Sequence, residues 1–279
     1  MKNVLVLGGN GYLGSKIINK LLTADNVFCT IKKGESLNLL EKKKNIHVVS
    51  NNLDEIKEVI AQNRIDVLIN TVCCYERNGT PLSNVVDANL VFPISVIPYA
   101  IENGINKIIT IDTSLPENVN LYSMTKKTIA NIGKYYCENY QNITFYNILL
   151  ENFYGKDEPK NRFLHIMVDK LKKNEPLELT SGTQRRDFIY IDDVLSAFEI
   201  LLSNNDVGYH NIPVGTGEGP TIKEVICYLK KITDSKSVLD FGAVASRINE
   251  PDCISNLEYL TKFGYKVKYP YKVGLKEII

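Results

Sequence analysis

The sequence of 279 residues contains no tryptophan and only three histidines. These histidines, His47, His165 and His210, are widely spaced and have no cysteine pairs as partners. Zinc sites and histidine-based catalytic triads need such groupings, so we predict neither a metal site nor a triad of that kind. Any chemistry must therefore rest on other side chains.

Disulfide patterns and long hydrophobic runs are also missing. The six cysteines, at positions 29, 73, 74, 137, 227 and 253, show no CxxC spacing, which is typical of reduced thiols rather than of a disulfide framework. No stretch of about 18 apolar residues occurs, and the start MKNVLVLGG lacks a signal-peptide cleavage site. We therefore expect a cytoplasmic protein without a membrane span.

An excess of charge of one sign is absent as well. Lys and Arg number 33 against 32 Asp and Glu, and the densest basic cluster, Lys42 to Lys44, is explained as a solvated helix end. Both features argue against a nucleic-acid-binding surface. With 44% apolar and 23% charged residues the composition is globular, and the length allows one large α/β domain or two smaller ones.

Short β-branched runs alternate with helical patterns over residues 1–150. This alternation predicts a parallel sheet with helices on both faces, the doubly wound α/β fold. The predicted strands are Val4–Leu7, Val27–Ile31, Ile46–Val49, Val67–Thr71, Lys107–Ile111 and Ile143–Leu149. The predicted helices are Tyr12–Leu22, Leu53–Asn63, Leu82–Asn103 and Tyr122–Tyr140.

The alternation loosens after Gly155, where we predict a smaller mixed α/β lobe. Helices are expected over 161–173, 192–203 and 221–231, with turns over 180–186. We expect a dinucleotide-binding Rossmann domain, residues 1–158 with returning segments near 188–212, and a substrate-binding lobe, residues 159–279.

The first predicted strand runs directly into the glycine-rich stretch GGNGYLG. Gly8, Gly11 and Gly14 have the spacing that allows a tight turn, close approach of backbone N–H groups to a pyrophosphate, and close packing of a helix on the strand. A purely structural turn is the alternative. Because a strand precedes the loop and a helix follows it, we predict a dinucleotide site that also includes Asn10, Tyr12 and Leu13.

The second predicted strand decides which dinucleotide is favoured. NAD sites usually end this strand with an acid that binds the ribose hydroxyls, but here the first acid is Glu35. Lys32 and Lys33 could neutralise the 2'-phosphate of NADP, or simply face solvent. We favour NADP(H) as the cofactor. Asn52 and Leu53, after the third strand, are expected to contact the adenine.

Tyr122 and Lys126 stand at positions i and i+4 of a predicted helix, where a cation can lower the tyrosine pKa from about 10. Tyr12 and Lys16 have the same spacing, so location must decide between the pairs. Tyr122 follows the fifth strand, whose carboxyl end lies where doubly wound sheets bind ligands. We predict that Tyr122 donates a proton to a substrate reduced by nicotinamide hydride, while Lys126 supports it and anchors the ribose.

These motifs, with Asn89, Thr113/Ser114, ENFYG (151–155) and RRDFIYIDDV (185–194), resemble the extended short-chain dehydrogenase/reductase family over nearly the whole chain. The resemblance is to its nucleotide-sugar epimerase, dehydratase and reductase branch. The segments 73–77, 112–126, 179–193, 214–219 and 241–250 are similar to synthases of CDP-linked 3,6-dideoxy sugars, more to the paratose-forming type than to the abequose-forming type. This implies NADPH-dependent reduction of a 4-keto sugar for bacterial O-antigen synthesis.

The resemblance also implies roles for single residues. Thr113 or Ser114 would bond the substrate oxygen, and Asn89 would belong to the cofactor site. Substrate contacts are implied for the nucleotide-diphosphate sugar, with arginines suited to the diphosphate because their planar fork binds it bidentately. The residues concerned are Tyr75, Arg77, Asn152, Phe153, Phe163, Arg186 and Arg247, where packing for Tyr75 and Arg77 and a surface position for Arg247 are alternatives.

Departures from the family pattern refine the reaction type. Dehydratases carry an Asp-Glu pair after the catalytic Thr, whereas Ser114 and Leu115 follow Thr113 here. The missing acid after the second strand argues against tightly held NAD, as epimerases have. A reductase is favoured, with a dTDP-4-keto-6-deoxy-sugar reductase, a 4-epimerase and a cofactor-sensing regulator as alternatives. Leu149 replaces a common arginine, so the sugar pocket is expected to differ.

The long helices 82–103 and 122–140 resemble those that pair between subunits in this family. We therefore expect a homodimer, although monomers occur in this branch.

Overall fold

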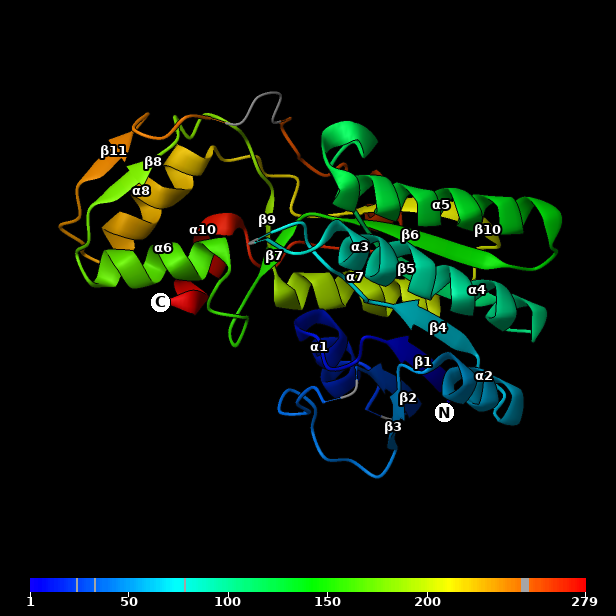
Figure 1. Cartoon of the computed structure of the whole chain (residues 1–279). Helices are drawn as coiled ribbons and strands as arrows, with labels where there is room; N and C mark the ends of the chain where they lie inside the picture. Colours follow the sequence, from blue (N-terminus) through cyan, green and yellow to red (C-terminus); the bar gives the residue numbers. More distant parts are fainter. Residues whose placement is uncertain (24, 33, 78, 247–250) are drawn as a thin grey trace. The chain divides into compact units, whose positions relative to one another are not determined.

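The computed structural model describes residues 1–23, 25–32, 34–77, 79–246 and 251–279. The chain divides into two compact units (Figure 1). Unit 1 consists of Met1–Leu149 and Phe198–Ile212, and unit 2 of Leu150–Ala197 and Pro213–Ile279.

Unit 1 is built on a seven-stranded sheet with the order β10-β6-β5-β4-β1-β2-β3. Strand β1 pairs in parallel with β2 and β4, β2 with β3, and β4 with β5. The strands are β1 Asn3–Leu7, β2 Asn26–Ile31, β3 Ile46–Ser50, β4 Val67–Asn70, β5 Lys107–Thr113, β6 Thr144–Leu150 and β10 Gly208–Val214. The predicted doubly wound α/β fold is confirmed, and the returning strand β10 supplies the seventh position.

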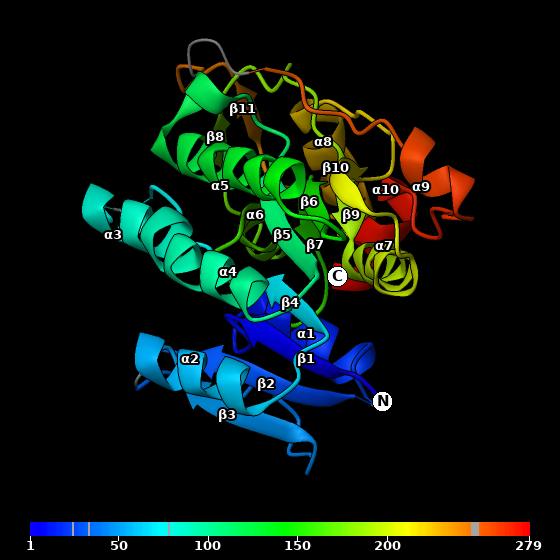
Figure 2. The same cartoon turned by 90° about the vertical axis from the view of Figure 1, so that its right-hand side faces the viewer.

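The helices of unit 1 lie on both faces of this sheet (Figure 2). On one face, apolar side chains of α2, α4 and α5 form a buried cluster with strand residues such as Leu5, Leu68 and Ile108. Helix α1 and the unit 1 part of α7 lie on the other face of the sheet. Burying each such side chain stabilises the fold by about 1.5–3 kcal/mol. The helices are α1 Tyr12–Lys20, α2 Leu53–Gln62, α3 Leu82–Val86, η1 Asp87–Val91, α4 Phe92–Glu102, α5 Leu121–Asn139 and α7 Ile191–Ser203.

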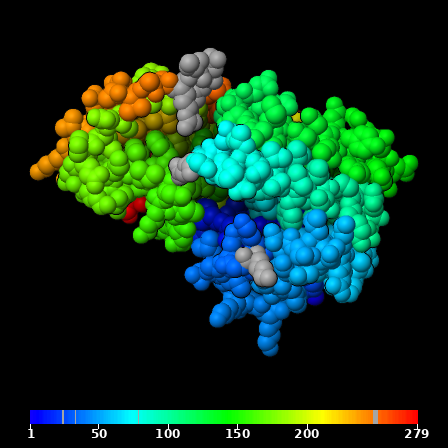
Figure 3. All heavy atoms as spheres, in the orientation of Figure 1, coloured from blue at the N-terminus to red at the C-terminus, as the bar shows by residue number. Residues whose placement is uncertain are grey.

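The continuous helical segment Leu82–Glu102 has the length and apolar composition of a membrane span. Its composition has a local explanation, since Val96, Ile97, Ala100 and Ile101 belong to the buried cluster against the sheet. The beginning of this segment, cyan in Figure 3, lies at the surface of unit 1.

Unit 2 contains two short parallel pairs, β7 Asn152–Tyr154 with β9 Phe188–Tyr190, and β8 Leu177–Leu179 with β11 Leu239–Phe241. Its remaining helices are α6 Phe163–Lys172, α8 Ile222–Ile232, α9 Glu258–Lys262 and α10 Tyr271–Gly274. The fully buried Asp187 joins its loops, because its carboxylate accepts hydrogen bonds from the backbone N–H groups of Thr216, Gly217 and Ser255.

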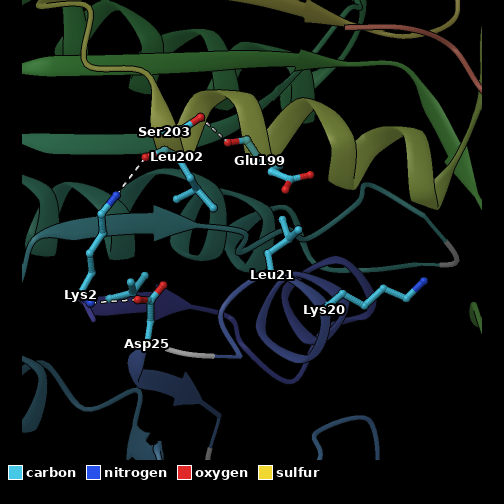
Figure 4. Close-up of a pocket in the computed structure, with 8 residues that line it drawn as sticks. Lys2, Lys20, Leu21, Asp25, Glu199, Leu202 and Ser203 are labelled. Atoms are coloured by element: carbon cyan, nitrogen blue, oxygen red, sulfur yellow. Dashed lines mark hydrogen bonds between the residues drawn. The ribbon is translucent and has the colours of Figure 1, made fainter. Parts of the chain in front are cut away.

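Two lysines cap the carboxyl end of α7 within unit 1. Lys107 is 5% exposed, and its Nζ donates to the carbonyls of Leu201, Leu202 and Asn204. Lys2 Nζ donates to the Leu202 carbonyl at 3.1 Å (Figure 4). These carbonyls would otherwise lack donors and carry the negative end of the helix dipole.

A cavity of about 240 Å³ beside this cap is lined by Lys2, Lys20, Asp25 and Glu199, among others. It lies near the amino ends of β1 and β2, whereas doubly wound sheets bind ligands at the carboxyl ends of their strands. We therefore do not assign the cavity to the dinucleotide.

Lys107→Met tests the helix cap. Burial and the charge of Lys2 lower the pKa of Lys107 to about 8, so the ammonium is largely protonated at pH 7. Removing it leaves buried carbonyls without a donor, and we expect the free energy of unfolding to fall by about 3 kcal/mol. Urea denaturation at pH 7 measures this. Lys134→Met, at an exposed ion pair with Glu138, is the control and should change stability by less than about 0.5 kcal/mol; equal effects would contradict the cap.

In unit 2 a buried carboxylate lies beside the start of α6. Glu158 is 4% exposed, with Arg162 Nε 3.2 Å from Oε2 and His165 Nε2 3.4 Å from Oε1. Oε2 makes no hydrogen bond of good geometry. Burial therefore raises the pKa of Glu158 to about 7, although the Arg162 charge opposes the shift.

A pH series tests this burial. Since the unfolded chain releases this proton near pH 4.5 and the folded chain near pH 7, stability falls as the pH rises between these values. We expect Glu158→Gln to remove that loss, so the variant should gain up to about 3 kcal/mol over wild type above pH 7 and little near pH 4.5. Chemical denaturation across this range measures the difference. Glu138→Gln, at an exposed site, is the control, and a difference independent of pH would refute the raised pKa.

Candidate active site

The glycine-rich loop joins β1 to α1 through a tight turn. Gly8 has φ of +78°, and Thr71 Oγ1 donates to the carbonyls of Leu7 and Gly8 at 2.8 and 3.1 Å. A Cβ at Gly14 would lie 2.5 Å from the Gly8 carbonyl oxygen, and one at Gly9 would lie 2.5 Å from Cys29 Cβ. The loop thus needs glycine for both conformation and space.

The N-terminus of α1 has the properties of a phosphate site. Its N-cap is Gly11, which has no side chain to accept from the first N–H groups of the helix, and no acid lies in the first turn. Tyr12 and Leu13 are the first helical residues, so their backbone N–H groups lie at the positive end of the helix dipole. These residues fit the pyrophosphate of a pyridine dinucleotide.

The residues predicted to contact the adenosine side of the cofactor have the following places in the structure. Lys32 is exposed after β2, and Lys33 lies outside the described residues. Asn52 is the N-cap of α2, and its Oδ1 accepts from the N–H groups of Asp54 and Glu55, which is a structural task that the sequence did not indicate. Leu53, the first residue of α2, packs against the buried cluster of unit 1.

The position of Tyr122 is set by how α5 begins. Asn120 and Ser123 form a reciprocal capping box, in which Ser123 N–H donates to Asn120 Oδ1 at 2.8 Å and Asn120 N–H donates to Ser123 Oγ at 3.2 Å. This cap starts the helix at Leu121, so Tyr122 lies in its first turn and Lys126 one turn later, pointing inward.

The loop after β4 packs along the start of α5. Lys126 Nζ, in a side chain 3% exposed, donates to the Val72 carbonyl at 2.7 Å. Cys73 lies near the Tyr122 side chain, whose pKa it helps to raise, and the Tyr75 ring lies 5.0 Å from the Tyr122 ring. The loop therefore packs beside the phenol. The Arg77 guanidinium stacks on Tyr75 at 4.7 Å, and Leu121 N–H donates to Glu76 Oε2.

The electrostatics of Tyr122 differ from the expectation. Burial, then Cys73, Tyr75 and Asp112, raise the pKa of Tyr122 well above its ordinary value, whereas the sequence predicted a lower one. Desolvation is the largest cause of this shift and outweighs any lowering by a nearby cation; Lys126 Nζ donates to the Val72 carbonyl, and burial lowers the pKa of Lys126 itself. Tyr122 thus keeps its proton at neutral pH, as a proton donor requires.

Asn89 was expected in the cofactor site, but the structure gives its side chain a different set of partners. It is fully buried in η1, where its Oδ1 accepts from Cys74 N–H at 2.8 Å and its Nδ2 donates to the Cys74 carbonyl at 2.7 Å. Asn89 therefore fixes the loop that carries Cys73 and Tyr75. The η1 turn is a π-helix, a feature often found at functional sites.

Thr113 ends β5 and is 7% exposed, and its Oγ1 accepts from Leu115 N–H at 3.2 Å. Ser114 comes next and is half-buried. Sequence reasoning missed three side chains that contact these groups or Tyr122. They are Cys73, Asp112 and Lys127. Asp112 could have been found because polar residues end a buried strand there, and Lys127 because it is a second lysine directly after Lys126.

The predicted substrate residues of unit 2 belong to different elements. Asn152 is exposed, and its N–H donates to the Asp187 carbonyl, while Phe163 is 39% exposed at the start of α6. Arg186 is 8% exposed and donates to the carbonyls of Arg185 and Pro251. Arg247 lies outside the described residues. Among the residues that the structure does describe, no three His, Cys, Asp or Glu side chains group as metal ligands.

Comparisons with known proteins agree with this arrangement. The CDP-abequose synthases of Salmonella typhimurium and Salmonella muenchen are 29% and 27% identical to this chain, covering 99% and 100% of it and 97% of their own lengths. The crystal structure of UDP-glucuronic acid 4-epimerase from Bacillus cereus has the same fold, with a TM-score of 0.86 and 20% identity over 99% of this chain and 97% of that one. The NAD dependent epimerase/dehydratase family model matches residues 4–215, which include the glycine loop, Tyr122 and Lys126, and the chain belongs to this family.

Proposed function

We propose that the chain is an NADPH-dependent nucleotide-sugar 4-ketoreductase that reduces CDP-4-keto-3,6-dideoxy-D-glucose to CDP-paratose for bacterial O-antigen synthesis. The observation that carries the proposal is the environment of Tyr122. Its phenol has a raised pKa, lies in the first turn of α5 and packs against the Tyr75 ring, one turn before the buried Lys126. A protonated phenol beside a buried cation suits donation of a proton to a reduced carbonyl.

The chemistry divides between the cofactor and this chain's residues. NADPH, when bound, supplies the hydride that forms the new C–H bond at C4. Tyr122 gives its proton to the 4-oxygen as the carbonyl π bond breaks, and the phenolate left behind is stabilised by the Lys126 ammonium until solvent returns the proton. The hydroxyl of Thr113 or Ser114 orients the 4-oxygen by a hydrogen bond.

The reaction type rests on the residues that come directly after the candidate hydroxyl of Thr113. Ser114 and Leu115 succeed it, so the site lacks the acid pair that a 4,6-dehydratase uses for proton abstraction. The CDP substrate is supported by two relatives that are named CDP-abequose synthases and match along almost their full lengths. Paratose and abequose differ in configuration at C4, so abequose is the alternative product. Because several proteins of similar fold are named 4-epimerases, a 4-epimerase is the second candidate reaction type.

For substrate binding we propose the residues that the sequence resemblance implies, with Asn152 contributing backbone groups. The Tyr75 ring packs against Tyr122 and the Arg77 guanidinium packs on Tyr75, which favours contacts of both residues near the reacting sugar. Asn152, Phe163, Arg186 and Arg247 would contact the nucleotide and diphosphate, for which arginine is suited. We also retain the proposed homodimer, which exposed apolar side chains on α3, η1 and α5 favour, including Leu82, Val91, Met124 and Tyr135.

The first experiment measures NADPH consumption by the purified protein with CDP-4-keto-3,6-dideoxyglucose, beside dTDP-4-keto-6-deoxyglucose, and identifies the product by NMR. We expect turnover with the CDP sugar and a paratose product. Tyr122→Phe should lower kcat by about 1000-fold because it removes the proton donor, while NADPH binding stays close to wild type. Tyr135→Phe, on the exposed face of α5, is the matched control and should turn over normally.

Other outcomes redirect the proposal. An abequose product would keep the reaction and change its stereochemistry, and turnover of the dTDP sugar alone would replace the substrate. Tightly bound NAD in the purified protein with no NADPH consumption would favour the 4-epimerase. Normal turnover by Tyr122→Phe would remove Tyr122 from the mechanism.

For the cofactor we propose NADP(H), with Lys32 and Lys33 neutralising the 2'-phosphate. Replacing both lysines by alanine should raise the KM for NADPH by about tenfold or more, because each charge-assisted phosphate contact is lost, and should leave the KM for NADH nearly unchanged. Initial-rate kinetics with each cofactor measure this. Lys42→Ala, in the exposed cluster beyond this loop, serves as the control. Equal effects on NADPH and NADH would reject the phosphate role.

A further inference from the structure

Asp112 is a buried carboxylate for which the proposed reaction has no direct use. It lies in β5, immediately before Thr113, and is 2% exposed. Its Oδ1 accepts from the Thr113 backbone N–H at 2.6 Å, and its Oδ2 accepts from Lys127 Nζ and Asn147 Nδ2, each at 2.9 Å. A buried carboxylate persists when its charge and both oxygens are satisfied, and these three donors satisfy them.

Lys127 completes the hold on Thr113. The same Nζ that pairs with Asp112 also donates to the Thr113 carbonyl at 2.6 Å. The N–H of Thr113 is therefore bound by the carboxylate and its C=O by the ammonium of one ion pair. The Lys127–Asp112 pair thus restrains the peptide units before and after Thr113, the residue that carries the candidate hydroxyl. The peptide unit after Thr113 joins it to Ser114.

A polar network in the sheet fixes the carboxylate in turn. Asn147 of β6 accepts from Thr110 Oγ1 at 3.1 Å and donates to Asn211 Oδ1 of β10 at 2.9 Å. Tyr209 OH donates to the same Asn211 oxygen at 2.7 Å. Because Asn147 is 1% exposed and engaged by β5 and β10, Asp112 has little room to move toward another partner.

Consecutive lysines of α5 contact the ends of two neighbouring strands. Lys126 Nζ donates to the carbonyl of Val72, two residues after β4 ends, and Lys127 Nζ donates to the carbonyl of Thr113 at the end of β5. The helix that carries Tyr122 is therefore tied separately to the loop beside the phenol and to the residue that bears the candidate hydroxyl.

We propose that the Lys127–Asp112 pair is a positioning device for the reduction: it sets the Thr113 and Ser114 hydroxyls at a fixed place relative to Tyr122, so that the 4-oxygen of the sugar meets both groups at once. Neither residue touches the substrate. The inference rests on the proposed ketoreductase function, and it predicts an effect on the chemical step rather than on ligand binding, because displacing a reacting group by about 1 Å costs on the order of 100-fold in rate.

Lys127→Met is the decisive variant, since it removes the ammonium and keeps the length of the side chain. We expect kcat with CDP-4-keto-3,6-dideoxyglucose to fall about 10- to 100-fold while the KM values for NADPH and the sugar nucleotide change less than about threefold. In the protein without ligands, hydrogen exchange at the Thr113 amide should accelerate by about tenfold or more. Lys134→Met, at an exposed lysine of the same helix, should change neither quantity.

The two measurements separate the possible failures. If wild type does not reduce the CDP sugar, the proposed function fails, and the exchange rate at Thr113 alone decides whether the pair restrains that residue. Wild-type kcat in Lys127→Met, or a loss carried entirely by KM, would overturn the positioning role. Lys127→Met leaves Asp112 without its cation, so Asp112→Asn is the second variant. If the pair acts as a unit, Asp112→Asn should lower kcat as Lys127→Met does. Normal kcat in Asp112→Asn would also overturn the inference.

Discussion

The active site of this chain depends on how α5 is attached to the sheet. The helix begins at a capping box and then turns two consecutive lysines inward, where Lys126 binds the Val72 carbonyl and Lys127 binds the Thr113 carbonyl. Lys126 is 3% exposed and the Lys127 side chain is 21% exposed, so these carbonyls replace much of the hydration of the first ammonium and part of that of the second. Tyr122, the β4 loop and the end of β5 consequently occupy places that are set by one helix and its two cations.

The same burial explains the acid–base behaviour of the site. Desolvation disfavours the phenolate of Tyr122 and the ammonium of Lys126, so the pKa of the tyrosine rises and that of the lysine falls. The proposed reduction needs the phenol protonated before hydride transfer, and the raised pKa of Tyr122 meets this requirement. In that proposal Lys126 matters most after the proton has left, when a phenolate one helical turn away becomes its electrostatic partner.

The sequence predicted the fold better than the contacts within the site. Strands and helices of residues 1–150 could be predicted because β-branched runs, glycines and helix caps act locally, and no predicted end lies more than two residues from the observed one. Asn52 and Asn89 were assigned to the cofactor because their positions matched a pattern, and this stays a prediction; what the pattern did not indicate is that their amides also bind backbone at Asp54 and Cys74. The Lys127–Asp112 pair could not be predicted, since it joins a strand and a helix whose relative rotation depends on the packed core.

In the proposed cofactor site, the residues expected near the adenosine carry opposing charges, so selectivity between NADP and NAD would depend on their balance. No acid ends β2, but Glu35 lies a few residues further, and Asn10 of the glycine loop donates to its Oε2 at 2.7 Å. This bond turns the carboxylate toward the loop, where it would repel a 2'-phosphate, while Lys32 supplies the opposite charge. Preference for NADP over NAD therefore requires that attraction of the 2'-phosphate by the lysines exceed its repulsion by Glu35. The bond from Asn10 fixes where the Glu35 carboxylate lies and so determines the size of that repulsion.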